Sequence, residues 1–327
     1  MTNRREFLIL ATAAGMATTA SARPMGVVQT VQGPLDSARL GFTLTHEHIC
    51  VSSPNLREDR PGSIAKAVDK LKEARDAGID SIIDVSTFDV GRDIRFGEEI
   101  SRKSGMQIVA CTGRHLFAPE SSQARSVEEL TEFFIGEIER GIDDTDIKAG
   151  VIKVATRADE VTPSEEKALR AAARACKATG VPIETHTHSR RRGGERQVEI
   201  FEAEGVRPPR IALGHSDDTD DMEYLIGLAK RGYTLGMDHL FRGAAEGAMV
   251  PWQRRADAIK KLVDQGFGDR IFLSNDWVYG DAERAQENPD GLLFNTRKTI
   301  PYLKSIGVSA KAIHAITTGN PGRFWAQ

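Results

Sequence analysis

A His-x-His pair closes a short apolar run near the start of the chain. His46 and His48 follow residues 41–44 and are separated only by Glu47. Side chains two positions apart on a strand project to the same side, so two imidazoles at a strand end can hold one metal ion. Any one of the eight histidines is more often a core or surface residue than a ligand. The pair therefore gains weight only together with other signals.

Four more residues of ligand type occupy comparable places. Lys153 lies inside an apolar run, where a charged amine is costly unless its charge is removed or paired. The other three each end a separate apolar run: His186, His215 and Asp276. Because all these signals fall at the ends of predicted strands, chance is a poor explanation, and the set favours a metal site.

The residue types indicate which metals and which chemistry such a site would support. Imidazole and carboxylate suit Zn, and also Co or Mn, and the number of ligands suits two divalent ions. A neutral lysine can react with carbon dioxide to form a carbamate, N6-carboxylysine, whose two oxygens can bridge two metals. This accounts for Lys153 in a strand. Two metals sharing a hydroxide would lower the pKa of water and polarise a substrate oxygen, which is hydrolytic chemistry.

Strand-like apolar runs alternate with amphipathic helical stretches from Phe42 onward. Capping boxes at residues 126–129 and 162–165 predict the starts of two helices. Eight βα units without a linker between them predict a parallel sheet and favour a closed (β/α)8 TIM barrel over a doubly wound sheet. The first strand ends in His-Glu-His rather than in a Gly-rich phosphate turn, which supports the barrel. Active-site residues of such barrels lie at the C-terminal ends of the strands, where the candidate ligands fall.

The bulk composition excludes several classes. The 327 residues are 40% hydrophobic and 28% charged with a net charge of −3, so neither nucleic-acid binding nor binding to an anionic membrane is indicated. The cysteines are an odd, widely spaced set without a Cys-x-x-Cys pair: Cys50, Cys111 and Cys176. They predict core thiols rather than a disulfide framework.

The first 22 residues differ from the rest. Arg4 and Arg5 precede a small, apolar stretch at 9–19 and an Ala-x-Ala site at 20–22, which is the order of a twin-arginine export signal. The stretch is too short and too rich in Ala and Thr to span a bilayer stably. We therefore expect a signal at 1–22, a single barrel domain at 23–327, and a periplasmic or membrane-associated protein.

Several longer segments carry a resemblance. They are residues 41–48, 152–156, 214–221 and 274–277, continued by 84–93, 125–134 and 320–324. They resemble the bacterial phosphotriesterases of the amidohydrolase superfamily over essentially the whole chain after the signal. The octapeptide at 214–221 is the most specific of these segments.

The resemblance implies a division of the ligands between two metals. His46, His48 and Asp276 would bind the more buried ion, and His186 and His215 the more exposed one. Carboxylated Lys153 and a hydroxide would bridge the two ions. The family also implies a homodimer and a small-molecule ester as substrate.

The same resemblance assigns a proton relay to Asp276, His239 and Asp218. A carboxylate beside the reacting oxygen, then a histidine, then an exit carboxylate is a sound route for a proton. For His239 the plain alternative is a pocket-wall residue without a kinetic role.

The pocket departs from the family more than the metal site does. His115 stands where phosphotriesterases carry a tryptophan, and Asp281 lies near the place of a phenylalanine. Aromatic walls suit a flat aryl leaving group, so these residues make the pocket more polar. The segment after His239, which contains Arg242, is shorter than expected. The candidate pocket residues are Val51, Val90, His115, Arg242, Val278 and Asp281.

Three functions follow from this pattern. Hydrolysis of organophosphate triesters is the first, because residues 216–219 match the phosphotriesterases rather than the related lactonases. Hydrolysis of a lactone or another carboxylic ester by the same centre is the second. A non-catalytic periplasmic metal-binding protein is the third, and Asp218 and His239 argue against it because storage needs no proton exit.

Overall fold

The computed structural model describes residues 26–157, 160–245, 247–280 and 288–327. The expected export signal at 1–22, the start of the expected barrel domain at 23–25, and Asp281 lie outside the described residues.

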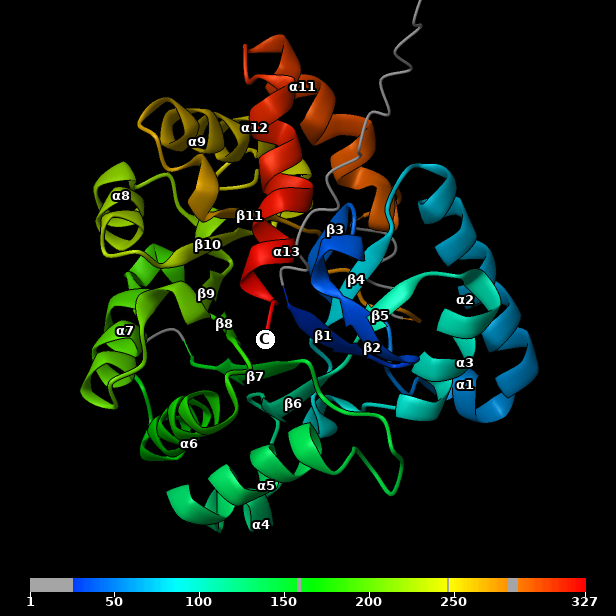
Figure 1. Cartoon of the computed structure of the whole chain (residues 1–327). Helices are drawn as coiled ribbons and strands as arrows, with labels where there is room; N and C mark the ends of the chain where they lie inside the picture. Colours follow the sequence, from blue (N-terminus) through cyan, green and yellow to red (C-terminus); the bar gives the residue numbers. More distant parts are fainter. Residues whose placement is uncertain (1–25, 158–159, 246, 281–287) are drawn as a thin grey trace, which may run out of the picture.

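Parallel strands form a ring with helices around its outside (Figure 1). Within the described residues the ring contains, in chain order, β3 (Thr43–Glu47), β4 (Ser81–Asp84), β5 (Gln107–Val109), β6 (Cys111–Arg114), β7 (Val151–Ala155), β8 (Ile183–His186), β9 (Ile211–Gly214), β10 (Thr234–Met237) and β11 (Ile271–Leu273). Only Ala110 separates β5, which pairs with β4, from β6, which pairs with β7. These two therefore act as one interrupted strand, and the ring has the eight positions that the sequence predicts.

The ring closes just beyond β11. The Asp276 N–H donates to the His46 carbonyl at 3.0 Å, and the His48 N–H donates to the Trp277 carbonyl at 2.8 Å. His48 and Val278 form a parallel bridge. The backbone hydrogen bonds of the first and last positions are thus satisfied by each other, and the predicted TIM barrel is confirmed.

The helices follow the strands in βα order. They are α1 (Pro54–Glu58), α2 (Arg60–Asp76), α3 (Ile94–Ser104), α4 (Glu120–Ala124), α5 (Val127–Glu139), α6 (Pro163–Thr179), α7 (Gly193–Ala203), α8 (Met222–Lys230), α9 (Trp252–Asp264), α11 (Ile300–Ser305), α12 (Ala310–His314) and α13 (Asn320–Phe324). Both predicted capping boxes are present, Ser126 with Glu129 and Thr162 with Glu165. α6 ends at Gly180, whose φ of 80° suits a residue without a Cβ.

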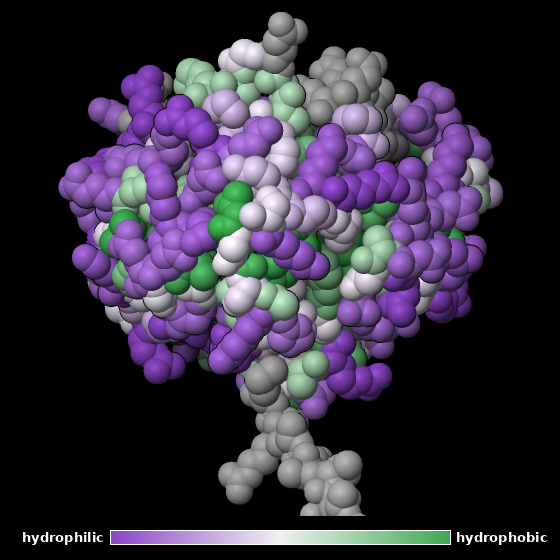
Figure 2. Space-filling model, turned by 90° about the horizontal axis from the view of Figure 1, so that it is seen from above, coloured by the Kyte–Doolittle hydropathy of each residue, from purple (hydrophilic) through white to green (hydrophobic). Residues whose placement is uncertain are grey.

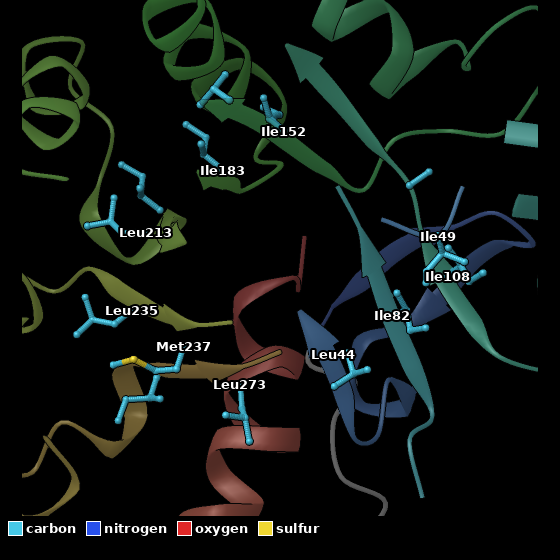
Figure 3. Close-up of a cluster of buried hydrophobic side chains, with 14 of the residues drawn as sticks. Leu44, Ile49, Ile82, Ile108, Ile152, Ile183, Leu213, Leu235, Met237 and Leu273 are labelled. Carbon is cyan, nitrogen blue, oxygen red and sulfur yellow. The ribbon is translucent and has the colours of Figure 1, made fainter. Parts of the chain in front are cut away.

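Alternate strand residues build two apolar layers. Leu44, Ile82, Ile152, Leu213 and Leu235 come from β3, β4, β7, β9 and β10 and pack toward the helices (Figure 3). The opposite set faces the barrel interior, and its apolar members fill the half of the barrel that is remote from the ligands. This arrangement leaves the C-terminal strand ends to polar side chains.

A hairpin and the C-terminus cover the apolar half. β1 (Val27–Thr30) pairs antiparallel with β2 (Gly33–Asp36), and Val28 joins the interior cluster. Trp325 is fully buried there, stacked on Phe272 at a centroid distance of 4.9 Å. The face of the molecule seen in Figure 2 is mainly hydrophilic, with apolar residues among the polar ones. Among the residues described, no helix combines the length and the apolar character needed to cross a bilayer.

Candidate metal centre

The structure brings all the sequence-predicted ligands to one place at the C-terminal ends of the strands. They are His46 and His48 of β3 and the turn after it, Lys153 of β7, His186 of β8, His215 directly after β9, and Asp276 three residues after β11. The Lys153 Nζ lies 2.7 Å from the His46 Nε2, and the His215 Nε2 lies 2.8 Å from the His186 Nδ1. The His48 Nε2 is 3.4 Å from Asp276 Oδ1. The His46 and His215 rings, 4.8 Å apart, join the two groups.

Two of these ligands have an unusual backbone. His215 has a φ of 58° and Asp276 a φ of 46°, in the left-handed region that residues with a Cβ rarely adopt. Such a conformation costs about 1–3 kcal/mol and persists only where the surroundings enforce it. Here the His215 N–H donates to Asp238 Oδ1 at 2.8 Å, and the Asp276 N–H donates to the His46 carbonyl. Two of the five non-glycine residues with a positive φ in the described chain are thus predicted ligands.

Buried carboxylates orient the imidazoles from below. Asp238 Oδ1 lies 2.7 Å from the His215 Nδ1, and Asp238 Oδ2 lies 3.1 Å from the His46 Nδ1. Glu184 Oε1 also lies 3.1 Å from the His46 Nδ1. A carboxylate at Nδ1 keeps the proton on that nitrogen and leaves the Nε2 lone pair for a metal. Neither carboxylate is among the residues predicted from the sequence, although Glu184, like Lys153, is a charge inside an apolar run.

Glu47 holds the segment that carries Asp276. It is buried between β3 and the turn after β11, where its carboxylate accepts hydrogen bonds from the Ser274 hydroxyl at 2.7 Å and the Trp277 N–H at 2.7 Å. Burial raises the pKa of Glu47 to about 8. The residue between the two histidines thus positions a third ligand, a role that the His-x-His spacing did not reveal.

The electrostatics suit cation binding. Burial lowers the pKa of His46, His186 and His215 well below the usual value, so these rings are neutral, which is the form that binds metal. Burial also lowers the pKa of Lys153, which favours the neutral amine that reacts with carbon dioxide. Four imidazoles, a carboxylate and an amine at contact distance fit a two-metal centre.

The residues of the predicted relay form a chain of hydrogen bonds. The His239 Nε2 lies 2.9 Å from Asp276 Oδ2, and its Nδ1 lies 3.1 Å from Asp218 Oδ2. The Arg255 guanidinium donates to Asp218 Oδ1 at 2.7 Å. Although burial opposes it, Asp218 and Asp276 raise the pKa of His239 to about 9. His239 also lines the cavity. Its position therefore agrees both with a proton relay and with a pocket-wall residue.

A cavity of about 370 Å³ opens above the ligands. Five of the predicted pocket residues line it, namely Val51, Val90, His115, Arg242 and Val278. Leu116 and Phe117 line it as well and were not predicted. The Phe117 ring stacks on His115 at a centroid distance of 5.5 Å, a contact that no sequence pattern indicates.

Comparison with known proteins agrees with this geometry. Residues 26–325 match the model of the Phosphotriesterase family. The chain belongs to this family. Its members are metal-dependent hydrolases, which accounts for the cluster of ligands at the strand ends.

Similar proteins carry different names. A "Phosphotriesterase homology protein" of Mycobacterium tuberculosis is 34% identical over 324 residues, covering 92% of this chain and 98% of that protein. An "Aryldialkylphosphatase" of Saccharolobus solfataricus is 33% identical over 309 residues, covering 89% and 97%. An "N-acetyltaurine hydrolase" of Xenopus tropicalis is 26% identical over 343 residues, covering 91% and 97%. Family membership therefore establishes a hydrolase and leaves the substrate to the pocket.

Proposed function

We propose that this phosphotriesterase-family protein hydrolyses ester bonds with two divalent metal ions, Zn by preference, and that Lys153 is N6-carboxylated. The observation that carries this proposal is the convergence of four imidazoles, Asp276 and a buried lysine at the strand ends. When bound, the metals would supply a nucleophile at neutral pH and polarise the scissile bond.

The chain's own residues perform the remaining tasks. Asp238 and Glu184 hold two of the imidazoles in orientation. Asp276 takes up a proton from the reaction and passes it to His239, whose other nitrogen faces Asp218. Although burial opposes it, His239 and Arg255 lower the pKa of Asp218, which favours the ionised carboxylate beside that nitrogen. Truncation of Asp276, His239 or Asp218 would slow the departure of the proton.

Two substrate classes remain as candidates. A phosphotriester is the first, supported by the family motif at residues 214–221 and by the relative named aryldialkylphosphatase. A lactone or other carboxylic ester is the second, supported by the polar wall that His115 and Arg242 provide. A purely metal-binding role is opposed by the continuous relay from Asp276 to Asp218.

The test uses purified protein reconstituted with Zn or Co in the presence of bicarbonate. Turnover of an aryl dialkyl phosphate is compared with that of an acyl-homoserine lactone, and the chelator-treated protein serves as the control. Metal-dependent turnover of the phosphate at the higher kcat/KM supports the first candidate, and the reverse ranking supports the second. If two metals bind and neither compound nor any simple ester is cleaved, the proposal of ester hydrolysis is wrong.

Two expectations from the sequence remain proposals. Export is supported by the order of the twin arginine, the apolar stretch and the Ala-x-Ala site, and N-terminal sequencing of the cellular protein would test it. A homodimer is supported by the family resemblance, and the mass in solution from light scattering would test it.

A further inference from the structure

Arg242 places a positive charge in the wall of the substrate cavity. It belongs to the 3-10 helix Leu240–Ala244, three residues after His239, and it lines the same cavity as the metal ligands His48, His186 and Asp276. Its side chain is 33% exposed. A substrate in the cavity can therefore reach the guanidinium.

The partners of Arg242 differ from those of the other arginines near the barrel mouth. Arg92 pairs with Glu137, and Arg255 pairs with Asp218. Arg114 donates to the carbonyl oxygens of Ser122 and Ser164. The terminal guanidinium nitrogens of these three side chains thus donate within the protein, although the Nε of Arg92, like that of Arg242, has no hydrogen-bond partner among the described residues.

Arg242 makes fewer polar contacts within the described part of the chain. Its Nη2 lies 3.6 Å from Asp276 Oδ2, beyond hydrogen-bond distance, and its guanidinium lies 5.3 Å from the centre of the Phe241 ring. Its Nε is buried without a hydrogen-bond partner among the described residues. Asp276 is a weak counter-ion for Arg242, because His239 bonds the same Oδ2 at 2.9 Å and His48 faces Oδ1. A guanidinium has five donors in a planar fork, so most of its capacity is unused.

We propose that Arg242 binds a carboxylate carried by the substrate, so that the preferred substrate is an anionic carboxylic ester or lactone. This inference rests on the proposed ester hydrolysis. The carboxylate would accept two hydrogen bonds from the fork, the strongest pairing that arginine makes. Since Arg242 lies beside Asp276, the carboxylate and the scissile carbonyl are separated by only a few bonds.

Arg242 would also disfavour neutral substrates. A neutral ester that fills the cavity would cover the guanidinium without supplying an acceptor, and an unpaired charge removed from water is costly. A site built around a charged group therefore rejects the analogue that lacks its partner. The charge of Arg242 in the cavity wall therefore favours an anionic carboxylic ester over a neutral phosphotriester.

The kinetic test uses two esters of the same length. The wild type and Arg242→Met are compared on 4-nitrophenyl hemiglutarate, which ends in a carboxylate, and on 4-nitrophenyl pentanoate, which ends in a methyl group. We expect the wild type to prefer the hemiglutarate by about tenfold or more in kcat/KM. Arg242→Met should lose this preference, because turnover of the hemiglutarate falls while that of the pentanoate rises, and Arg242→Lys should retain part of it. Arg254→Met, an exposed arginine on α9, is the matched control and should leave the preference unchanged.

A binding test separates this inference from the proposed function. Binding of 5-oxohexanoate, a ketone that carries a carboxylate and is not hydrolysed, is compared with that of 2-hexanone by calorimetry. Both metal-loaded and metal-free protein are used, so that binding of the carboxylate to a metal is distinguished from binding to Arg242. We expect Arg242→Met to weaken 5-oxohexanoate binding about tenfold in both forms and not to weaken 2-hexanone binding.

Each outcome decides the point. If no ester is hydrolysed but Arg242 still controls 5-oxohexanoate binding, the proposed function fails and the carboxylate site stands. Equal binding by the wild type and Arg242→Met would overturn the site. So would a lower metal content in Arg242→Met, because Arg242 would then position Asp276 rather than bind substrate.

Discussion

The floor and the wall of the cavity are built in different ways. The floor consists of the predicted ligands together with Asp238 and Glu184, all within three residues of a barrel strand. The wall consists of residues that follow the strands in loops and in two 3-10 helices, namely Val51, Val90, His115, Leu116, Phe117, Arg242 and Val278. Lys153 of the floor is fully buried, whereas Phe117 of the wall is 69% exposed. The sheet thus holds the chemistry rigidly, while the substrate is selected by residues that can change without disturbing it.

Lys153→Ala tests the floor most severely. The substitution removes the group that contacts His46 at 2.7 Å and would bridge the two metals. We expect the bound metal to fall from two ions per chain to one or none, and kcat to fall about a thousandfold, since two-metal stabilisation is worth several kcal/mol. Metal analysis and steady-state kinetics on the same preparation measure both effects.

The exposed Lys311 of α12 provides the control. Lys311→Ala should keep two metals and full activity, and both variants should show wild-type circular dichroism. Retention of two metals by Lys153→Ala would contradict its assignment as a ligand.

Substitution of a carboxylate beneath the imidazoles should weaken metal binding more when that carboxylate contacts more rings. Asp238 contacts both His46 and His215, whereas Glu184 contacts only His46 among the ligand imidazoles of the described chain. We expect Asp238→Asn to weaken metal binding by about 100-fold and Glu184→Gln by about tenfold, the two ends of the range for such partners. Competition with a chelator measures both affinities. An equal or larger effect of Glu184→Gln would show that orientation of His46 alone controls the site.

The contrast between floor and wall also explains what the sequence could predict. Every floor ligand lies inside or just after an apolar run, so strand periodicity and barrel geometry together place it. The role of Glu184 could not be predicted, because a single charge in a strand does not reveal its partner 138 positions away along the chain. The β1–β2 hairpin was not predicted, because its strands are short and Pro34 makes one of them untypical of a strand. The stacking of Phe117 on His115 depends on loop conformation, which residue spacing does not encode.

His115→Trp should change the wall without affecting the floor. The loop is held through the backbone, because the His115 N–H donates to Asp89 Oδ1 at 2.9 Å, and a new side chain leaves this bond intact. An added aromatic contact is worth about 0.5–1.5 kcal/mol. We expect kcat/KM for an aryl dialkyl phosphate to rise about fivefold relative to that for a lactone. Metal content should stay at two ions per chain, and a loss of metal would show that the wall supports the floor.

Phe117→Ala should have the smallest effect, and it tests whether the two regions are independent. The ring is 69% exposed and stacks on His115, so its removal should change the free energy of unfolding by less than about 0.5 kcal/mol. KM for an aryl ester should rise about twofold, because one face of the bound ring loses an apolar neighbour, while kcat stays the same. Met249 is 68% exposed and does not line the cavity, so Met249→Ala is the matched control and should change neither constant. A fall in kcat for Phe117→Ala alone would mean that motion of the wall reaches the metals through His115, whose ring lies 5.2 Å from that of His186. The wall and the floor of the cavity would then not be independent, because the contact between His115 and His186 would couple them.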